Sequence, residues 1–268
     1  MGRGAAGRLS FERAGEQTVA RAVYAESPLR LLTPRCRGPG AMVFTSTFGG
    51  GLLDGDSLKL DVEVSPGARA GIFSQGPTRV FRSPGGVLSK LTARVADEAA
   101  LVLAPDPVAC FAGARFDQQT SVELTASGSL VLQEVLSGGR DVFRFSRFRS
   151  SICVRRAGLT LLDEALLLDQ AHGDIALRFG RFQALATLVV VGPLFDELRQ
   201  KASAAVGSLA LSRNARLVQA ASPLGDALVV RIGGETVEAV LRALRGHLSG
   251  IPAFLGNDPW RRDAPLAA

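Results

Sequence analysis

The glycine-rich segment 48–56, with the sequence FGGGLLDGD, leads directly into the alternating run 58–64, LKLDVEV. In that run four aliphatic side chains alternate with lysine, aspartate and glutamate, which predicts a strand with one buried and one exposed face. Glycine allows positive φ angles and close backbone approach, so Asp54 and Asp56 are expected at a fixed place beside the sheet. The segment indicates a β-rich chain.

Further short apolar or alternating runs follow, separated by glycine, proline and serine turns. They predict a mainly β fold, with strands at 18–24, 58–64, 70–74, 78–81, 88–95, 99–103, 121–124, 130–136, 150–154, 159–162 and 227–232. About two helices are expected in the C-terminal third. One begins at Pro193 and runs to about residue 206, and the other, 235–248, carries an aliphatic stripe and ends at the Gly250–Pro252 segment. Residues 1–268 are expected to form one domain, with 1–12 as a loose tail.

The small number of cysteines and histidines limits the kinds of metal site and catalytic site that this chain can form. The cysteines Cys36, Cys110 and Cys153 are scattered and form no Cys-x-x-Cys pair, and His172 and His247 are the only histidines. This predicts neither a disulfide framework nor a stable metal site with soft ligands, so a metal ion would have to bind loosely through oxygen atoms. No Gly-x-Ser-x-Gly motif accompanies the serines, and we expect no enzyme activity and no tightly bound cofactor.

Targeting and membrane signals are also weak. The first residues show no charged region followed by an apolar one, and the longest apolar run, 185–195, is short and interrupted by a Gly-Pro pair. A cytoplasmic protein without a membrane segment is expected. The net charge of +6 comes almost entirely from arginine, and it is compatible with an acidic protein partner or with nucleic acid.

Two segments allow more than one interpretation. Gly49, Gly50 and Gly55 lack the Gly-Lys-Ser/Thr continuation of a phosphate loop and the repeats of a calcium-binding turn, so a structural turn is the simpler explanation. The segment 140–156 interleaves phenylalanines with arginines. It suits either a half-buried strand with its arginines exposed or a surface for an acidic protein or RNA, for which no RNA-binding motif is present.

Five motifs in order resemble one known family. The Gly-Gly-x-x-x-Gly-Asp turn with its strand is followed by QGPTRVFRS at 75–83, LAPDP at 103–107, FAGARF at 111–116, and Gly139-Arg140 after a strand containing Glu134. Together they cover roughly residues 40–165, and the chain resembles the urease accessory protein UreD, called UreH in some bacteria. The family usually has a Gly-Glu pair shortly after Gly-Arg, whereas 141–145 reads DVFRF here.

The resemblance implies a stacked-sheet, solenoid-like body and a role as a urease maturation scaffold. Such proteins bind urease apoprotein and UreF, and through UreF the GTPase UreG, which carries nickel. In this sequence Asp56, Glu134 and Glu164, with Thr78, would line an internal route along which Ni²⁺ passes transiently. From the residues alone, these carboxylates are either solvated on alternating strands or buried with water or a cation. A partner surface is expected at Arg140, Arg144, Arg147 and Arg149, and nucleic acid is the less favoured partner.

Overall fold

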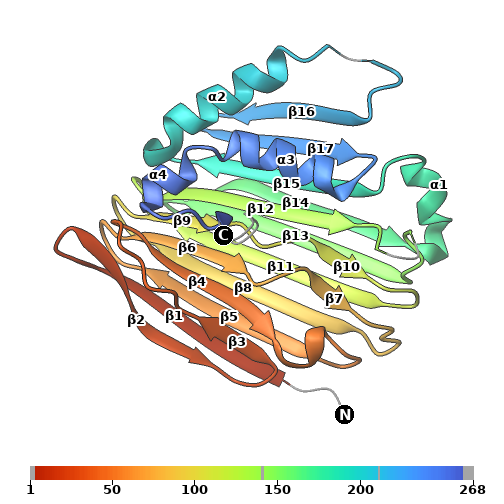
Figure 1. The fold of residues 1–268 in the computed structure, drawn as a ribbon, viewed down its shortest axis with the longest axis horizontal. Helices are drawn as coiled ribbons and strands as arrows, with labels where there is room; N and C mark the ends of the chain where they lie inside the picture. The colour runs from red at the N-terminus through yellow and green to blue at the C-terminus, as the bar shows by residue number, and fades with distance from the viewer. Residues whose placement is uncertain (1–3, 140–141, 211, 262–268) are drawn as a thin grey trace, which may run out of the picture.

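The computed structural model describes residues 4–139, 142–210 and 212–261 as two facing β-sheets with helices against one of them (Figure 1). Sheet A has the order β14-β13-β11-β8-β5-β1-β2. In chain order its strands are β1 Gly4–Ala14, β2 Gln17–Ala25, β5 Ser57–Val64, β8 Val87–Val95, β11 Arg115–Leu124, β13 Arg147–Arg156 and β14 Leu159–Asp169.

Sheet B has the order β16-β17-β15-β12-β9-β6-β4-β3, and the short strands β7 and β10 pair beside β12. Its strands are β3 Leu29–Leu32, β4 Ala41–Thr47, β6 Arg69–Ser74, β7 Thr78–Val80, β9 Ala100–Leu103, β10 Val108–Cys110, β12 Ser129–Ser137, β15 Ala184–Val191, β16 Leu217–Leu224 and β17 Ala227–Gly234.

The centre of the molecule is a solenoid. From β4 to β13 the chain passes back and forth between the sheets, so that β5, β8, β11 and β13 pair in parallel in sheet A, and β4, β6, β9 and β12 do so in sheet B. A narrow third side is made by Leu52, β7 and β10, also in parallel register. The mainly β, stacked-sheet prediction is confirmed.

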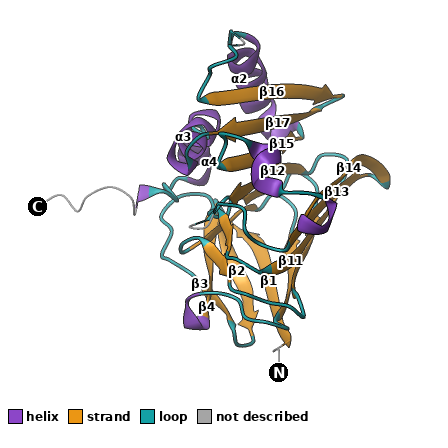
Figure 2. Ribbon diagram, turned by 90° about the vertical axis from the view of Figure 1, so that its right-hand side faces the viewer, coloured by secondary structure: helices purple, strands orange, loops and turns teal. Residues whose placement is uncertain are grey.

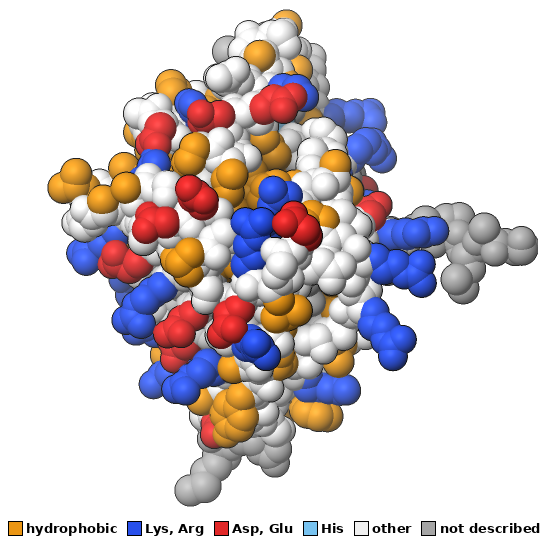
Figure 3. All heavy atoms as spheres, turned by 90° about the vertical axis from the view of Figure 1, so that its left-hand side faces the viewer, with side chains coloured by type: hydrophobic (Ala, Val, Ile, Leu, Met, Phe, Trp, Pro, Cys, Tyr) orange, Lys and Arg blue, Asp and Glu red, His pale blue; other side chains and the backbone are white. Residues whose placement is uncertain are grey.

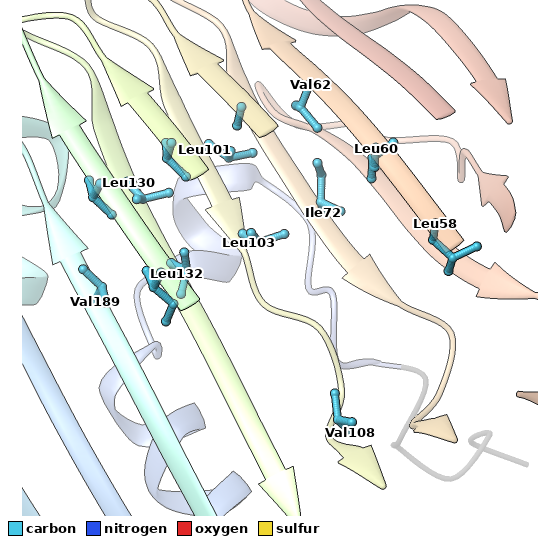
Figure 4. Close-up of a cluster of buried hydrophobic side chains, with 14 of the residues drawn as sticks. Leu58, Leu60, Val62, Ile72, Leu101, Leu103, Val108, Leu130, Leu132 and Val189 are labelled. Carbon is cyan, nitrogen blue, oxygen red and sulfur yellow. The ribbon is translucent and has the colours of Figure 1, made fainter. Parts of the chain in front are cut away.

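The apolar side chains divide into two cores. In β5 every second residue is buried, as the alternation predicts, and these side chains meet those of sheet B between the sheets. Figure 4 shows Leu58, Leu60 and Val62 on one side of this core, with Leu103 and Leu130 among the residues of the other sheet. A second core lies between the opposite face of sheet B and the helices. Strands β12 and β15 are therefore apolar on both faces, as is usual for covered sheets.

The described residues include four α-helices: α1 Ile175–Phe179, α2 Asp196–Gly207, α3 Val237–His247 and α4 Ile251–Leu255. Helices α2 and α3 pack against β15–β17 (Figure 2), and they confirm the two predicted helices. The segment beginning at Gly250 was expected only to end α3. Instead α4 begins within this segment, at Ile251. Pro252 is tolerated in the first turn because the N–H that it lacks would have no intrahelical partner there. Across the described residues, no helix has the length and apolar character needed to cross a membrane.

The predicted tail at residues 1–12 is wrong from Gly4 onward. Gly4–Ala14 forms β1, which lies between β5 and β2 and pairs with β5 over residues 4–11 and with β2 over residues 7–14. Leu9 and Phe11 are completely buried. Gly7 lies so close to Leu29 and Leu60 that a β-carbon at this position would approach their side chains to 2.7 and 3.0 Å. The N-terminal strand is thus an interior part of sheet A.

Candidate functional site

The glycine-rich turn is fastened to the third side of the solenoid. The Leu52 N–H donates to the Arg79 carbonyl at 2.8 Å, and the Phe81 N–H donates to the Leu52 carbonyl at 3.0 Å. A β-carbon on Gly51 would lie 2.6 Å from the Phe81 ring and 2.8 Å from the Arg79 carbonyl oxygen. Gly49, Gly50 and Gly55 have φ angles of 81°, 75° and 81°, which suit glycine. The turn therefore fixes the position of β7.

The two aspartates of the turn bind backbone amides. Asp56 is buried, and its Oδ2 accepts a hydrogen bond from the Leu53 N–H at 2.8 Å. Asp54 Oδ1 accepts one from the Gly85 N–H at 2.7 Å, which ties the turn to the loop before β8. Aspartates commonly hold turns in this way. The contacts support the structural explanation of the turn.

Two substitutions of Asp56 separate its structural role in the turn from the role along a nickel route that the family resemblance implies. Asp56→Ala leaves the Leu53 N–H without this charged acceptor and is expected to lower the free energy of unfolding by about 1–3 kcal/mol. Asp56→Asn keeps an acceptor oxygen and is expected to retain most of the stability. Urea denaturation measures both variants. An alanine variant as stable as the wild type would contradict the structural role, whereas an asparagine variant that is stable but delivers less nickel would support a role in transport.

A cavity of about 350 Å³, here called the inter-sheet cavity, lies between the sheets beside the third side of the solenoid. Its volume is sufficient for several water molecules. Part of the wall is aliphatic, from residues such as Leu58, Leu60 and Leu132. The remainder is polar and includes the cationic side chains of Arg79 and Lys90. It also carries oxygen-bearing side chains from both sheets and the adjoining loops, among them Thr45, Ser74, Thr78, Asp106, Gln118 and Glu134. A cavity with this lining can hold water or a weakly bound cation.

Glu134 of β12 is a carboxylate of the cavity wall that is held by hydrogen bonds from the facing sheet. Ser150 Oγ lies 2.6 and 2.8 Å from its two carboxylate oxygens, and Gln118 Nε2 also donates to it. Both donors come from sheet A, so the contact crosses the space between the sheets. Burial raises the pKa of Glu134, the two donors act in the opposite direction, and the negative charge of Glu164 raises the pKa further. The hydrogen-bond donors to Glu134 are neutral, so a cation beside it would stabilise its charged form.

The raised pKa of Glu134 predicts a pH dependence of stability. Folding takes up a proton between the unfolded pKa, near 4.5, and the higher pKa of the folded state. The stabilisation from this group is complete below the lower value and is lost as the pH rises through the higher one. Glu134→Gln stays neutral, so it should gain stability relative to the wild type between about pH 5 and pH 8. Denaturant unfolding at both pH values measures this difference, and a constant difference would contradict it.

Glu164 lies on the inner side of β14 and forms an ion pair with Arg231 of β17, with 2.8 Å between Oε2 and Nη2. Arg231 is the register partner of Thr187, and Thr187 is the register partner of Glu134. A polar row thus runs across the inner face of sheet B from Glu134 through Thr187 to Arg231. The ion pair with Glu164 joins the two sheets at the end of this row.

The structure brings together only part of the predicted set. Thr78 and Glu134 both line the inter-sheet cavity, and Glu164 is close enough to affect the pKa of Glu134. Asp56 is held within the turn, and neither Asp56 nor Glu164 is among the described residues of the cavity wall. Within the described ranges, no three His, Cys, Asp or Glu side chains are grouped so that they could hold a metal ion.

The structure describes three of the four arginines proposed as a partner surface. Arg140 lies outside the described residues, and Arg144 is exposed in the loop before β13. Arg147 and Arg149 lie on β13, and Arg149 forms a 3.6 Å ion pair with Asp117 of β11. Figure 3 shows acidic and basic side chains interspersed on the face that is at the left in Figure 1. The phenylalanines of the same segment, Phe143, Phe145 and Phe148, are buried in the core and give bases nothing to stack on.

Comparison with known proteins identifies the family. A family model described as "UreD urease accessory protein" matches residues 3–262. The chain belongs to the UreD family. It is 44% identical to "Urease accessory protein UreD" of Sorangium cellulosum (strain So ce56), over 97% of this chain and 85% of that protein. It is 38% identical to the protein of the same name from Anaeromyxobacter sp. (strain Fw109-5), over 97% and 90% of the two chains. "Urease accessory protein D" of Arabidopsis thaliana is 28% identical over 96% and 99%.

The most informative site residues of this UreD-family chain were not predicted from its sequence. Gln118, Ser150 and Arg231 hold the two glutamates. Gln118 and Arg231 belong to no motif that the sequence singles out, and in the segment 140–156 the pattern concerns the arginines and phenylalanines and not Ser150. Ser89, Gln118 and Ser150 are neighbours in register on β8, β11 and β13. Three polar residues at the same level of a buried face would have been a signal, but only once the strand register was known.

Proposed function

We propose that this UreD-family protein is a non-enzymatic scaffold for urease maturation, which binds urease apoprotein and helps to deliver nickel to its active site. Membership of a family of urease accessory proteins supports the maturation role. The observation that supports nickel passage is the inter-sheet cavity, which is lined by oxygen-bearing side chains and contains Glu134. Nickel is the cargo in this proposal and not a resident cofactor.

The donor chemistry fits a passage better than a storage site. Glu134 and Thr78 offer a carboxylate and a hydroxyl, and Gln118 adds a side-chain amide. Hard oxygen ligands hold Ni²⁺ less firmly than imidazole or thiolate ligands do. A passage must release its ion, so weak ligands suit it. Cys110 is buried and its pKa is raised to about 12 by burial, so its thiol stays protonated and is a poor metal ligand at neutral pH.

The proposal includes partners and a compartment. By the family resemblance, the protein acts in the cytoplasm in a complex with the urease structural subunits, UreF and UreG, with UreG bound through UreF. UreG would release nickel on GTP hydrolysis, and the ion would then cross the UreD-family protein. Glu134, Thr78 and Glu164 are the residues proposed to face it.

Complex formation is tested by co-expressing the tagged chain with urease structural subunits and UreF, followed by affinity purification and mass spectrometry. We expect both partners in one complex, stable enough to survive gel filtration, and neither with the tag alone. A soluble, folded chain that captures neither partner would overturn the scaffold function. Co-purifying nucleic acid, seen as absorbance at 260 nm, would instead support the arginine segment as an RNA surface.

A further inference from the structure

The polar row on sheet B reaches the outside of the molecule at the Glu164–Arg231 ion pair. Glu134, at the inner end of the row, is held by side chains of both sheets. At the outer end, the Arg231 side chain is 46% exposed and that of Glu164 is 23% exposed. The row therefore passes from the enclosed carboxylate to solvent between β14 and β17.

At this outer end, Arg231 is the counter-ion of Glu164. The negative charge of Glu164 raises the pKa of Glu134, and the Arg231 guanidinium lies 2.8 Å from the Glu164 carboxylate. A divalent cation entering the row from Glu134 would be attracted by Glu164 and repelled by the guanidinium. It would gain Glu164 as a ligand only if Arg231 moved away. Because Arg231 is half exposed, its side chain can move into solvent without burying an unpaired charge.

We propose that Arg231 closes the β14–β17 end of the nickel route by occupying Glu164, and that an arriving cation must displace it to pass. This inference rests on the proposed function and concerns the regulation of the same site. Glu164 then has two alternating partners: the Arg231 guanidinium when no ion is in the route, and the nickel ion while it passes. Arg231 is a positioning residue in this account, since it acts on the cation through Glu164.

The test measures Ni²⁺ binding to the purified full chain by isothermal titration calorimetry. Arg231→Gln frees Glu164 and is expected to bind Ni²⁺ about tenfold more tightly than the wild type. If Ni²⁺ binding to the wild type is too weak to measure, measurable binding to Arg231→Gln counts as the same expected gain. The double variant Arg231→Gln with Glu164→Gln should lose this gain. Arg231→Lys keeps the positive charge and should behave as the wild type, which separates charge from packing.

Arg155→Gln is the matched control, because Arg155 forms an exposed ion pair with Glu123 at 3.7 Å on the outer face of sheet A. It should leave Ni²⁺ binding unchanged. Equal binding by Arg231→Gln and the wild type would overturn the closing role, as would an equal gain in Arg155→Gln. The nickel content of urease made with Glu134→Gln tests the route itself. If that content falls while Arg231→Gln binds like the wild type, the route stands and its closure by Arg231 is wrong.

Discussion

Replacing Glu134 with glutamine is expected to lower the nickel content of co-expressed urease by about tenfold, an effect typical of losing one important group around a metal. Glutamine has nearly the same shape as glutamate and can still accept the Ser150 hydrogen bond, but it carries no charge for the ion. The fold and the complex with partners should therefore persist. Metal analysis of purified urease, at limiting nickel in the medium, measures the effect.

Glu123→Gln provides the control for this experiment. Glu123 lies on β11 in exposed contact with Arg155, so the same chemical change is made on the outer face of sheet A. This variant should give urease with wild-type nickel. If Glu134→Gln assembles normally and urease nickel is unchanged, Glu134 is not on the route. If both variants reduce nickel equally, the effect is one of general charge and again contradicts a role for Glu134.

Truncating Phe11 to alanine is expected to lower the free energy of unfolding by about 3–5 kcal/mol, the range found when a buried phenylalanine is replaced by alanine. Phe11 is completely buried and lies opposite Val64 of β5 and Ala20 of β2. A loss of this size is a large fraction of the stability of an ordinary domain. Thermal and urea unfolding measure it directly.

Deletion of residues 1–14 should have a still larger effect. It removes β1 from between its neighbours, leaves β2 without its partner, and exposes the edge of β5. An uncovered edge of this kind promotes aggregation, so we expect little soluble protein. Phe11→Leu fills most of the same space and should stay soluble and close to wild-type stability. A soluble deletion variant with native stability would show that β1 is dispensable.

Strands were predicted correctly where apolar and polar residues clearly alternate, and they were missed where small or proline residues hide that pattern. The run 58–64 is unambiguous and is confirmed as part of β5. Gly4–Ala14 alternates as well, but its buried positions include Ala5 and Gly7, whose small side chains give almost no hydrophobic signal. In β16 the proline at 223 argues against a strand. It is tolerated because β16 is an edge strand, where a missing N–H need not break a ladder.

The site was predictable only as a list of residues. The family motifs indicated Glu134 and Thr78, which share the inter-sheet cavity. Which carboxylate is enclosed, and which is paired, depends on contacts between strands far apart in the chain. Arg231 lies 67 residues from Glu164 in the chain and contacts it only because β14 belongs to sheet A and β17 to the facing sheet B. A periodicity within one strand carries no information about such a pair.

The nickel content of urease produced from otherwise complete urease genes, with and without this chain, tests whether the protein acts in urease maturation. We predict that urease is assembled but almost free of nickel when the chain is absent, and that its nickel is restored when the chain is supplied from a second plasmid. Urease that contains the same nickel in both cases would contradict a role for this protein in urease maturation.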